Sequence, residues 1–122
     1  MSEIFTLPHQ HHDPEEEKRI IEHMPEETTV SAVARAMKQL GDPSRLRIFW
    51  LLCHTEECVI DIAALVGMTS PAVSHHLRLL KDAGLLTTRR DGREVYYRAA
   101  DTSLVRELHA TIEHVAQISC PE

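Results

Sequence analysis

Histidine and acidic side chains occur in two parts of this chain with the types and spacing that metal ions need. His109 and Glu113 are four residues apart, which would place both side chains on one face of a helix. His9, His11 and His12 add three imidazoles near the start of the sequence, which has nine histidines in all. Imidazole and carboxylate ligands together suit Zn²⁺, Ni²⁺ or Co²⁺. The sequence therefore predicts a candidate site for a borderline divalent metal.

The three cysteines, Cys53, Cys58 and Cys120, offer a second kind of chemistry. We expect a cytoplasmic protein, and in that compartment three thiols argue against a disulfide scaffold. Cys120 together with Cys53 or Cys58 could instead form a dithiol pair, as a redox switch or a site for a thiophilic metal. Cys58 alone could also be a small buried hydrophobic residue.

Several classes of protein are excluded or disfavoured by what the sequence lacks. It has no nucleophile elbow, no phosphate-binding loop and no paired-carboxylate cleft. Asp101 and His114 could imitate an acid–base pair, but no third group is specified, so we predict that the chain is not an enzyme. No apolar run approaches the roughly 20 residues of a membrane span. The first residues lack the basic flank and apolar core of a signal peptide, so we expect no membrane partner.

Residues 69–97 carry the clearest structural pattern. Ser70-Pro71 predicts a helix start, apolar residues then recur at helical spacing, and Gly84 predicts the helix end. Asp91-Gly92 lies between two β-branched and basic runs, a strong signal for a β-hairpin. A helix followed by a basic hairpin is the winged helix-turn-helix arrangement, which binds double-stranded DNA. The fold class we predict is mainly α with a small β-hairpin.

The remaining segments complete that fold. We predict a short helix from Asp13 to Met24, helices over residues 29–40 and 44–53, a first helix of the helix-turn-helix around residues 62–66, and a last helix over residues 101–118. The domains we expect are an acidic, histidine-rich arm (1–28), a winged helix-turn-helix domain (29–118) and a short tail (119–122). The apolar stripe of the last helix needs a partner, and a second copy of the chain would supply one.

The net charge of −6 is unusual for a DNA-binding protein, but its distribution explains it. Residues 1–29 hold eight acidic and two basic side chains, a net of −6. Residues 30–100 hold ten basic and seven acidic side chains, a net of +3, and residues 101–122 hold four acidic and one basic, a net of −3. DNA binding needs a local basic surface rather than a basic whole, and the positive surplus lies in the segment with the helix and hairpin.

The chain resembles the ArsR/SmtB family of bacterial winged-helix repressors. The resemblance rests on the segments 40–48, 58–63, 70–80, 83–85 and 89–97. It implies a homodimer built on the first and last helices, a palindromic operator, and release when an inducer binds. Two recognition helices would then enter successive major grooves. The residues we expect at base edges or phosphates are Ser70, Ser74, His75, His76 and Arg78 in the helix, with Arg89, Arg90 and Arg93 in the wing.

The resemblance also indicates where an inducer could bind. One class of family sensors has Cys-Val-Cys where this chain has Cys58-Val59-Ile60, so one thiol is missing. Another class places Asp-x-His and His-x-x-His/Glu on the last helix, paired across the dimer. Asp101 and His114 match two of those ligands, thirteen residues apart, but Ser103 and Gln117 replace the other two.

We therefore expect a DNA-binding repressor released by a divalent metal, Zn²⁺ first and then Ni²⁺ or Co²⁺. The predicted ligands come from Asp101, His109, Glu113, His114, His9, His11 and His12. The alternative is a thiol-based redox or thiophilic-metal sensor that uses Cys53, Cys58 and Cys120. A further alternative from another class is a winged-helix module that binds proteins rather than DNA. The intact basic wing beside a polar recognition helix favours DNA.

Overall fold

The computed structural model describes residues 7–121. The chain divides into two compact units, up to Val30 and from Ser31 onward, and each is described by itself. In the first unit, α1 (Pro14–Glu22) begins as predicted, because the Asp13 carboxylate accepts a hydrogen bond from the Glu15 amide at 3.0 Å. The helix ends two residues before the predicted Met24. A second helix, α2 (Glu27–Leu40), begins near the end of this unit.

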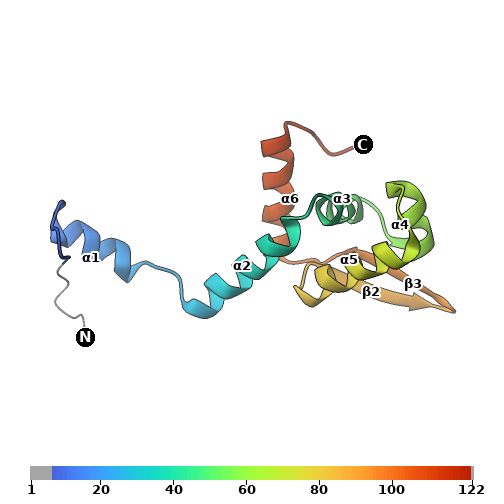
Figure 1. Ribbon diagram of the computed structural model, residues 1–122, viewed down its shortest axis with the longest axis horizontal. Coiled ribbons are helices and arrows are strands. Elements are labelled where there is room, and N and C mark those ends of the chain that lie inside the picture. Colours follow the sequence, from blue (N-terminus) through green and yellow to red (C-terminus); the bar gives the residue numbers. More distant parts are fainter. Residues whose placement is uncertain (1–6, 122) are drawn as a thin grey trace. The chain divides into compact units, whose positions relative to one another are not determined.

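The second unit holds the winged helix-turn-helix (Figure 1). Its remaining elements are α3 (Pro43–Leu52), β1 (Glu57–Cys58), α4 (Val59–Val66), α5 (Ser70–Asp82), β2 (Leu86–Asp91), β3 (Glu94–Ala99) and α6 (Ser103–Ala116). The predicted fold class, mainly helical with a small antiparallel sheet, is confirmed. Among the described residues, no helix has the length and apolar character that a bilayer span requires.

The core forms around α3, whose sequence is apolar on nearly every side. Ile48, Phe49 and Leu52 of this helix are buried, and they belong to one cluster with Val73 and Leu77 of α5. Figure 1 shows α3 between α6 on one side and α4 on the other. This helix is therefore central to the packing of the domain.

The helix-turn-helix consists of α4, a tight turn and α5. Gly67 adopts a left-handed conformation with φ +69°, which a residue without Cβ accepts at little cost. Thr69, rather than the expected Ser70, caps α5, because its backbone is extended and its hydroxyl accepts a hydrogen bond from the Ala72 amide at 3.3 Å. Pro71 is consequently the second helical residue. The expected cap is thus wrong by one residue, while the helix and its start at Ser70 are confirmed.

The predicted wing is a hairpin of β2 and β3, with Asp91 paired to Glu94 and Gly92 at φ +63° in the turn. A third strand, β1, extends the sheet to the order β1-β3-β2 and pairs Cys58 with Tyr96. We did not predict this strand, since two residues are too few to show an alternating pattern. Cys58 therefore belongs to the sheet, and α4 begins directly after it.

The last helix, α6, is shorter than predicted at both ends. Thr102 caps it, since its hydroxyl accepts a hydrogen bond from the Val105 amide at 3.2 Å. The helix therefore begins at Ser103, two residues after the predicted start. Val105 is buried in the core, whereas Val115 is 80% exposed. The apolar stripe of α6 is thus covered near its start and exposed near its end.

Candidate metal centre and DNA-binding face

Four potential metal ligands from separate parts of the second unit meet at one point. His54 follows α3, His109 and Glu113 lie on α6, and Cys120 follows α6. One ligand atom from each residue lies within 4.8 Å of all the others. Two imidazoles, a carboxylate and a thiol thus converge on a space of the size that one ion occupies.

The distances within the cluster are those of a hydrogen-bonded group. The Nε2 atoms of His54 and His109 are 3.0 Å apart, and the Glu113 carboxylate lies 3.6 Å from the first and 3.3 Å from the second. The Cys120 thiol donates to the same carboxylate, with Sγ 2.9 and 3.2 Å from its two oxygens. Tetrahedral zinc with nitrogen, oxygen and sulfur ligands separates its donor atoms by about 3.3–3.8 Å, so small shifts would accommodate an ion.

Local structure explains how each ligand reaches the site. His109 and Glu113 are one helical turn apart on α6, as predicted. The last turn of α3 continues beyond its end, where the His54 amide donates to the Leu51 carbonyl at 3.0 Å. After α6, Gln117 adopts a left-handed conformation with φ +57° and turns the chain back. This reversal brings Cys120 beside Glu113.

Trp50 supports the cluster from α3. Its indole N–H donates to Glu113 Oε2 at 3.3 Å, and its ring lies 4.4 Å from the His54 ring, centroid to centroid. Residues that orient metal ligands in this way help to set the affinity of a site. Trp50 therefore contacts both the Glu113 carboxylate and the His54 imidazole.

The pKa shifts of the cluster favour an ionised Glu113 beside a neutral His54 and a protonated Cys120 thiol. The hydrogen bond from Cys120, with help from Trp50, holds the pKa of Glu113 below its usual value. Burial, together with the neighbouring His109, lowers the pKa of His54, which leaves its imidazole neutral and able to bind a metal. The hydrogen bond to Glu113 raises the pKa of the Cys120 thiol. A metal ion would displace that proton, because the thiolate is the ligand form of cysteine.

The structure brings together only some of the predicted ligands. His109, Glu113 and Cys120 join the cluster, whereas Asp101 is exposed and pairs with Arg106 at 2.6 Å. His114 is also exposed and is not among the four residues of the cluster. The prediction that Asp101 and His114 bind a metal across a dimer stays a prediction.

The histidine-rich arm lies in the first unit, which is described by itself. The rings of His9 and His11 stack there, with centroids 5.5 Å apart. His12 follows in the same segment and is exposed. The proposed contribution of these three residues to a metal site also stays a prediction.

The other two cysteines have surroundings less suited to thiol chemistry. Burial, with the nearby Glu113 carboxylate, raises the pKa of Cys53 to about 12, so that thiol is protonated at neutral pH and a poor nucleophile. Cys58 is buried in β1. These surroundings favour the reading of Cys58 as a small hydrophobic residue.

Sequence reasoning missed His54 and Trp50. They are four residues apart at the end of α3, the spacing that places two side chains on one helix face. That spacing is the available indication, but Trp50 belongs to an apolar run, which by itself indicates a core position. His54 is also 55 residues from His109, so only the tertiary fold shows that the two meet.

The predicted DNA-binding residues of α5 fall into two groups. Ser74, His75 and Arg78 are exposed, while Ser70 is half-buried. His76 is also half-buried and its Nδ1 lies 3.3 Å from a guanidinium nitrogen of Arg45 in α3. The first group can reach DNA directly, whereas His76 connects the recognition helix to α3.

Burial lowers the pKa of His76. The positive charge of Arg45 also lowers this pKa, whereas the Asp42 carboxylate raises it. A neutral ring can accept the Arg45 N–H at Nδ1. The contact between α5 and α3 therefore depends on an uncharged histidine.

The wing arginines also differ from one another. Arg89 forms a 2.6 Å ion pair with Glu56, and its guanidinium lies 4.6 Å from the centre of the Tyr96 ring. Arg90 and Arg93 are exposed, and neither forms a salt bridge to another residue of the described region 7–121. Both are therefore available for phosphates.

Comparisons with known proteins agree with this architecture. A model of the family described as bacterial regulatory protein, arsR family, matches residues 42–88. A transcriptional repressor SmtB homolog of Synechocystis sp. is 39% identical over 85 residues, which are 70% of this chain and 64% of that protein. A cadmium resistance transcriptional regulatory protein CadC homolog of Staphylococcus aureus is 33% identical over 88 residues, 71% of this chain and 73% of that protein.

Solved structures show the same fold. The homodimeric winged helix-turn-helix DNA-binding domain of a possible ArsR-family regulator from Mycobacterium bovis has a TM-score of 0.67 and 38% identity. The match covers 74% of this chain and 82% of that one. The chain therefore belongs to the ArsR/SmtB family of winged-helix transcriptional regulators. The predictions of this family and of a protein that is not an enzyme are confirmed.

Proposed function

We propose that this chain represses transcription as a homodimer and that a divalent metal ion releases it from operator DNA. The observation that carries the proposal is the meeting of His54, His109, Glu113 and Cys120 within 4.8 Å. The relatives support the regulatory part, since one is named a transcriptional repressor and another a cadmium resistance regulator. The ion would act through this four-residue cluster within each subunit.

The donor set indicates which ions to expect. Two imidazoles, one carboxylate and one thiolate suit tetrahedral Zn²⁺ well, and Co²⁺ and Ni²⁺ accept the same nitrogen and oxygen ligands. Ions that bind chiefly through sulfur would find a single thiol at this point. We therefore place Zn²⁺ first, then Ni²⁺ or Co²⁺.

Exposed apolar side chains in the second unit support dimerisation. Met37 of α2 is 57% exposed and Val115 of α6 is 80% exposed, and the related Mycobacterium bovis domain is homodimeric. A symmetric dimer built on α2 and α6 would bury such side chains. It would also present two copies of α5 to successive major grooves of operator DNA.

The central helix α3 provides a route between metal and DNA. Trp50 and His54 lie at its end beside the metal cluster, and Arg45 in its first turn contacts His76 of the recognition helix. An ion that binds more tightly to one arrangement of α3 and α6 shifts the protein towards that arrangement. If that arrangement spaces the recognition helices less well for DNA, binding of metal and operator oppose each other.

The test is a fluorescence anisotropy titration of the full chain on a duplex selected from random sequence. Adding Zn²⁺ to the wild-type complex should weaken DNA binding at least fivefold, the lower end of ordinary allosteric coupling. His54→Ala should bind the duplex normally in the absence of metal and lose the response to Zn²⁺. Its matched control is His114→Ala, which removes an exposed histidine from the same domain and should keep the response.

The outcomes separate the hypotheses. A wild-type complex that is unaffected by Zn²⁺, Ni²⁺ and Co²⁺ would rule out release by these metals. A response lost in His114→Ala but kept in His54→Ala would indicate that the metal binds instead to the ligands predicted across the dimer, Asp101 and His114. A full chain that sediments as a monomer at micromolar concentration would exclude the homodimer.

A further inference from the structure

The segment that follows α6 contributes a ligand although little else holds it in place. We call residues 118–121 the return segment. It begins after Gln117, whose left-handed backbone is unfavourable for a residue with a Cβ. The amide of Ile118 donates to the Glu113 carbonyl at 3.0 Å and closes the helix end. Beyond that bond, the described contacts of the segment come from two side chains.

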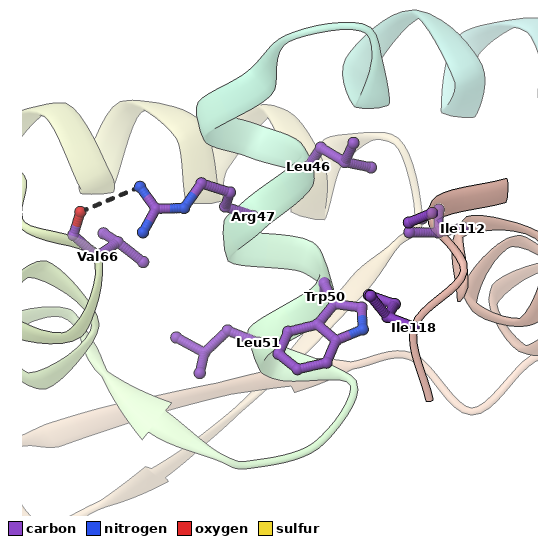
Figure 2. Close-up of a pocket in the computed structure, with 8 residues that line it drawn as sticks. Leu46, Arg47, Trp50, Leu51, Val66, Ile112 and Ile118 are labelled. Carbon is purple, nitrogen blue, oxygen red and sulfur yellow. Dashed lines mark hydrogen bonds between the residues drawn. The ribbon is translucent and has the colours of Figure 1, made fainter. Parts of the chain in front are cut away.

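The first contact is apolar. Ile118 forms one wall of a groove of about 370 Å³ between α3 and α6, whose other walls include Leu46, Trp50, Leu51 and Ile112. Figure 2 shows Ile118 beside the Trp50 ring, with Ile112 on the neighbouring helix. Ile118 nevertheless remains 47% exposed, so its packing here is incomplete.

The second contact is the thiol of Cys120. It hydrogen bonds to the Glu113 carboxylate, and its sulfur lies 3.8 Å from His109 Nε2. Every residue of the return segment is exposed. A thiol is a weak hydrogen-bond donor, and ordering four residues costs considerable chain entropy. These contacts are therefore too few to hold the segment firmly in place.

The other three ligands are held much more firmly. His54 follows directly on α3, and His109 and Glu113 lie within α6 and are braced by Trp50. Three ligands from packed helices can bind an ion before the fourth arrives. Once the ion is bound, the Cys120 thiol would release its proton to water, and a metal–thiolate bond would replace the thiol–carboxylate hydrogen bond.

We propose that the return segment is a metal-dependent strap, which the ion fixes across the α3–α6 groove by binding Cys120. This inference rests on the proposed metal site and adds that the return segment becomes ordered when the metal binds. The fixed strap holds Ile118 against Trp50 and joins the end of α6 to the end of α3. The ion and the strap together make a rigid unit from two helices that otherwise meet mainly through side chains. That rigidity is what α3 can pass on, through Arg45 and His76, to the recognition helix.

Backbone ¹⁵N relaxation of the full chain with and without Zn²⁺ tests the strap. In wild type without metal, order parameters at Ile118, Ser119 and Cys120 should lie below about 0.6, the flexible range. With one Zn²⁺ per subunit they should rise towards about 0.85, the value of rigid backbone. Cys120→Ser should still bind Zn²⁺, at least tenfold more weakly, and its segment should stay flexible under saturating metal.

The matched control is Ser119→Ala, which changes an exposed side chain of the same segment and leaves all four ligands in place. It should order with Zn²⁺ as wild type does. Unchanged order in wild type on Zn²⁺ binding, or equal ordering in Cys120→Ser, would overturn the strap.

Anisotropy measured on the same samples keeps this result separate from the proposed function. Release of DNA by Zn²⁺ without ordering of the segment would support the proposed function and contradict the proposed strap. Ordering of the segment without release supports the strap and contradicts release by metal.

Discussion

The indole N–H of Trp50 donates a hydrogen bond to the carboxylate of Glu113 at 3.3 Å, and so links the core helix α3 to the candidate metal centre on α6. The same indole ring lies against His54. Trp50 is the only tryptophan of the chain, and it also lines the apolar groove beside the cluster. One side chain therefore belongs both to the packing of the domain and to the orientation of two ligands.

Trp50→Phe should weaken metal binding while preserving the fold. Phenylalanine keeps an aromatic ring in the groove but removes the donor to Glu113, and loss of such a supporting bond typically costs about 10- to 100-fold in metal affinity. Competition with a chromophoric chelator would measure the change. Tyr96→Phe, which removes a polar group from an aromatic residue outside the cluster, should bind Zn²⁺ as wild type does. Equal affinities in Trp50→Phe and wild type would show that the bond does not support the site.

The wing arginines should contribute unequally to DNA binding. Arg90→Ala with Arg93→Ala removes two exposed cations, and if each neutralises one phosphate the slope of log K against log salt should fall by about 1.8. Arg89→Ala should change the slope less, because Glu56 already pairs with that guanidinium at 2.6 Å. Anisotropy titrations over a range of salt would measure both slopes. A larger loss for Arg89→Ala than for the double variant would contradict this assignment.

The junction between α3 and the recognition helix should be sensitive to loss of volume. Leu77 of α5 is fully buried, so Leu77→Ala should lower the free energy of unfolding by about 2–5 kcal/mol. Leu65→Ala on the exposed side of α4 is the control, with an expected loss below about 0.5 kcal/mol. Urea denaturation at a single protein concentration would compare them, since the stability of a dimer depends on concentration. Similar midpoints for the two variants would contradict the core assignment of Leu77.

The DNA-binding part of the fold was predictable because its information is local. Gly67, Gly84 and Gly92 stand where the chain must turn with positive φ, and apolar residues between them repeat at helical or strand spacing. The errors were the missed strand β1, which has only two residues, and the ends of elements, as at Thr69 and Thr102, where two neighbouring residues could each serve as a cap.

The four-residue ligand cluster was predictable only in the part that lies on one helix. His109 and Glu113 are recognisable as a pair by their spacing of four residues. His54, in contrast, precedes the wing in the sequence, while His109 follows it. The sequence indicates Cys120 only as a partner for other thiols, because no residue near it predicts the chain reversal at Gln117. Contacts between distant segments depend on the angle between α3 and α6, and that angle is a property of the packed core rather than of any local pattern.

The contact between Arg45 and His76 should make stability depend on pH. Burial and the guanidinium of Arg45 hold the pKa of His76 below the ordinary value of 6.5. As the pH falls from 7 through 6.5, the unfolded chain takes up a proton at this residue and the folded chain does not. This residue's contribution to stability is therefore complete above pH 6.5 and is lost as the pH falls towards the lowered pKa.

His76→Gln keeps an acceptor for Arg45 without a titrating group. The variant should show a flatter decline of unfolding free energy between pH 7 and 5, by less than about 1 kcal/mol because the ring is only half-buried. Urea denaturation of metal-free protein at several pH values would measure the difference. His75→Gln, at the exposed neighbouring position, should decline as wild type does. Parallel curves for wild type and His76→Gln would show that His76 is not held neutral by its contact with α3.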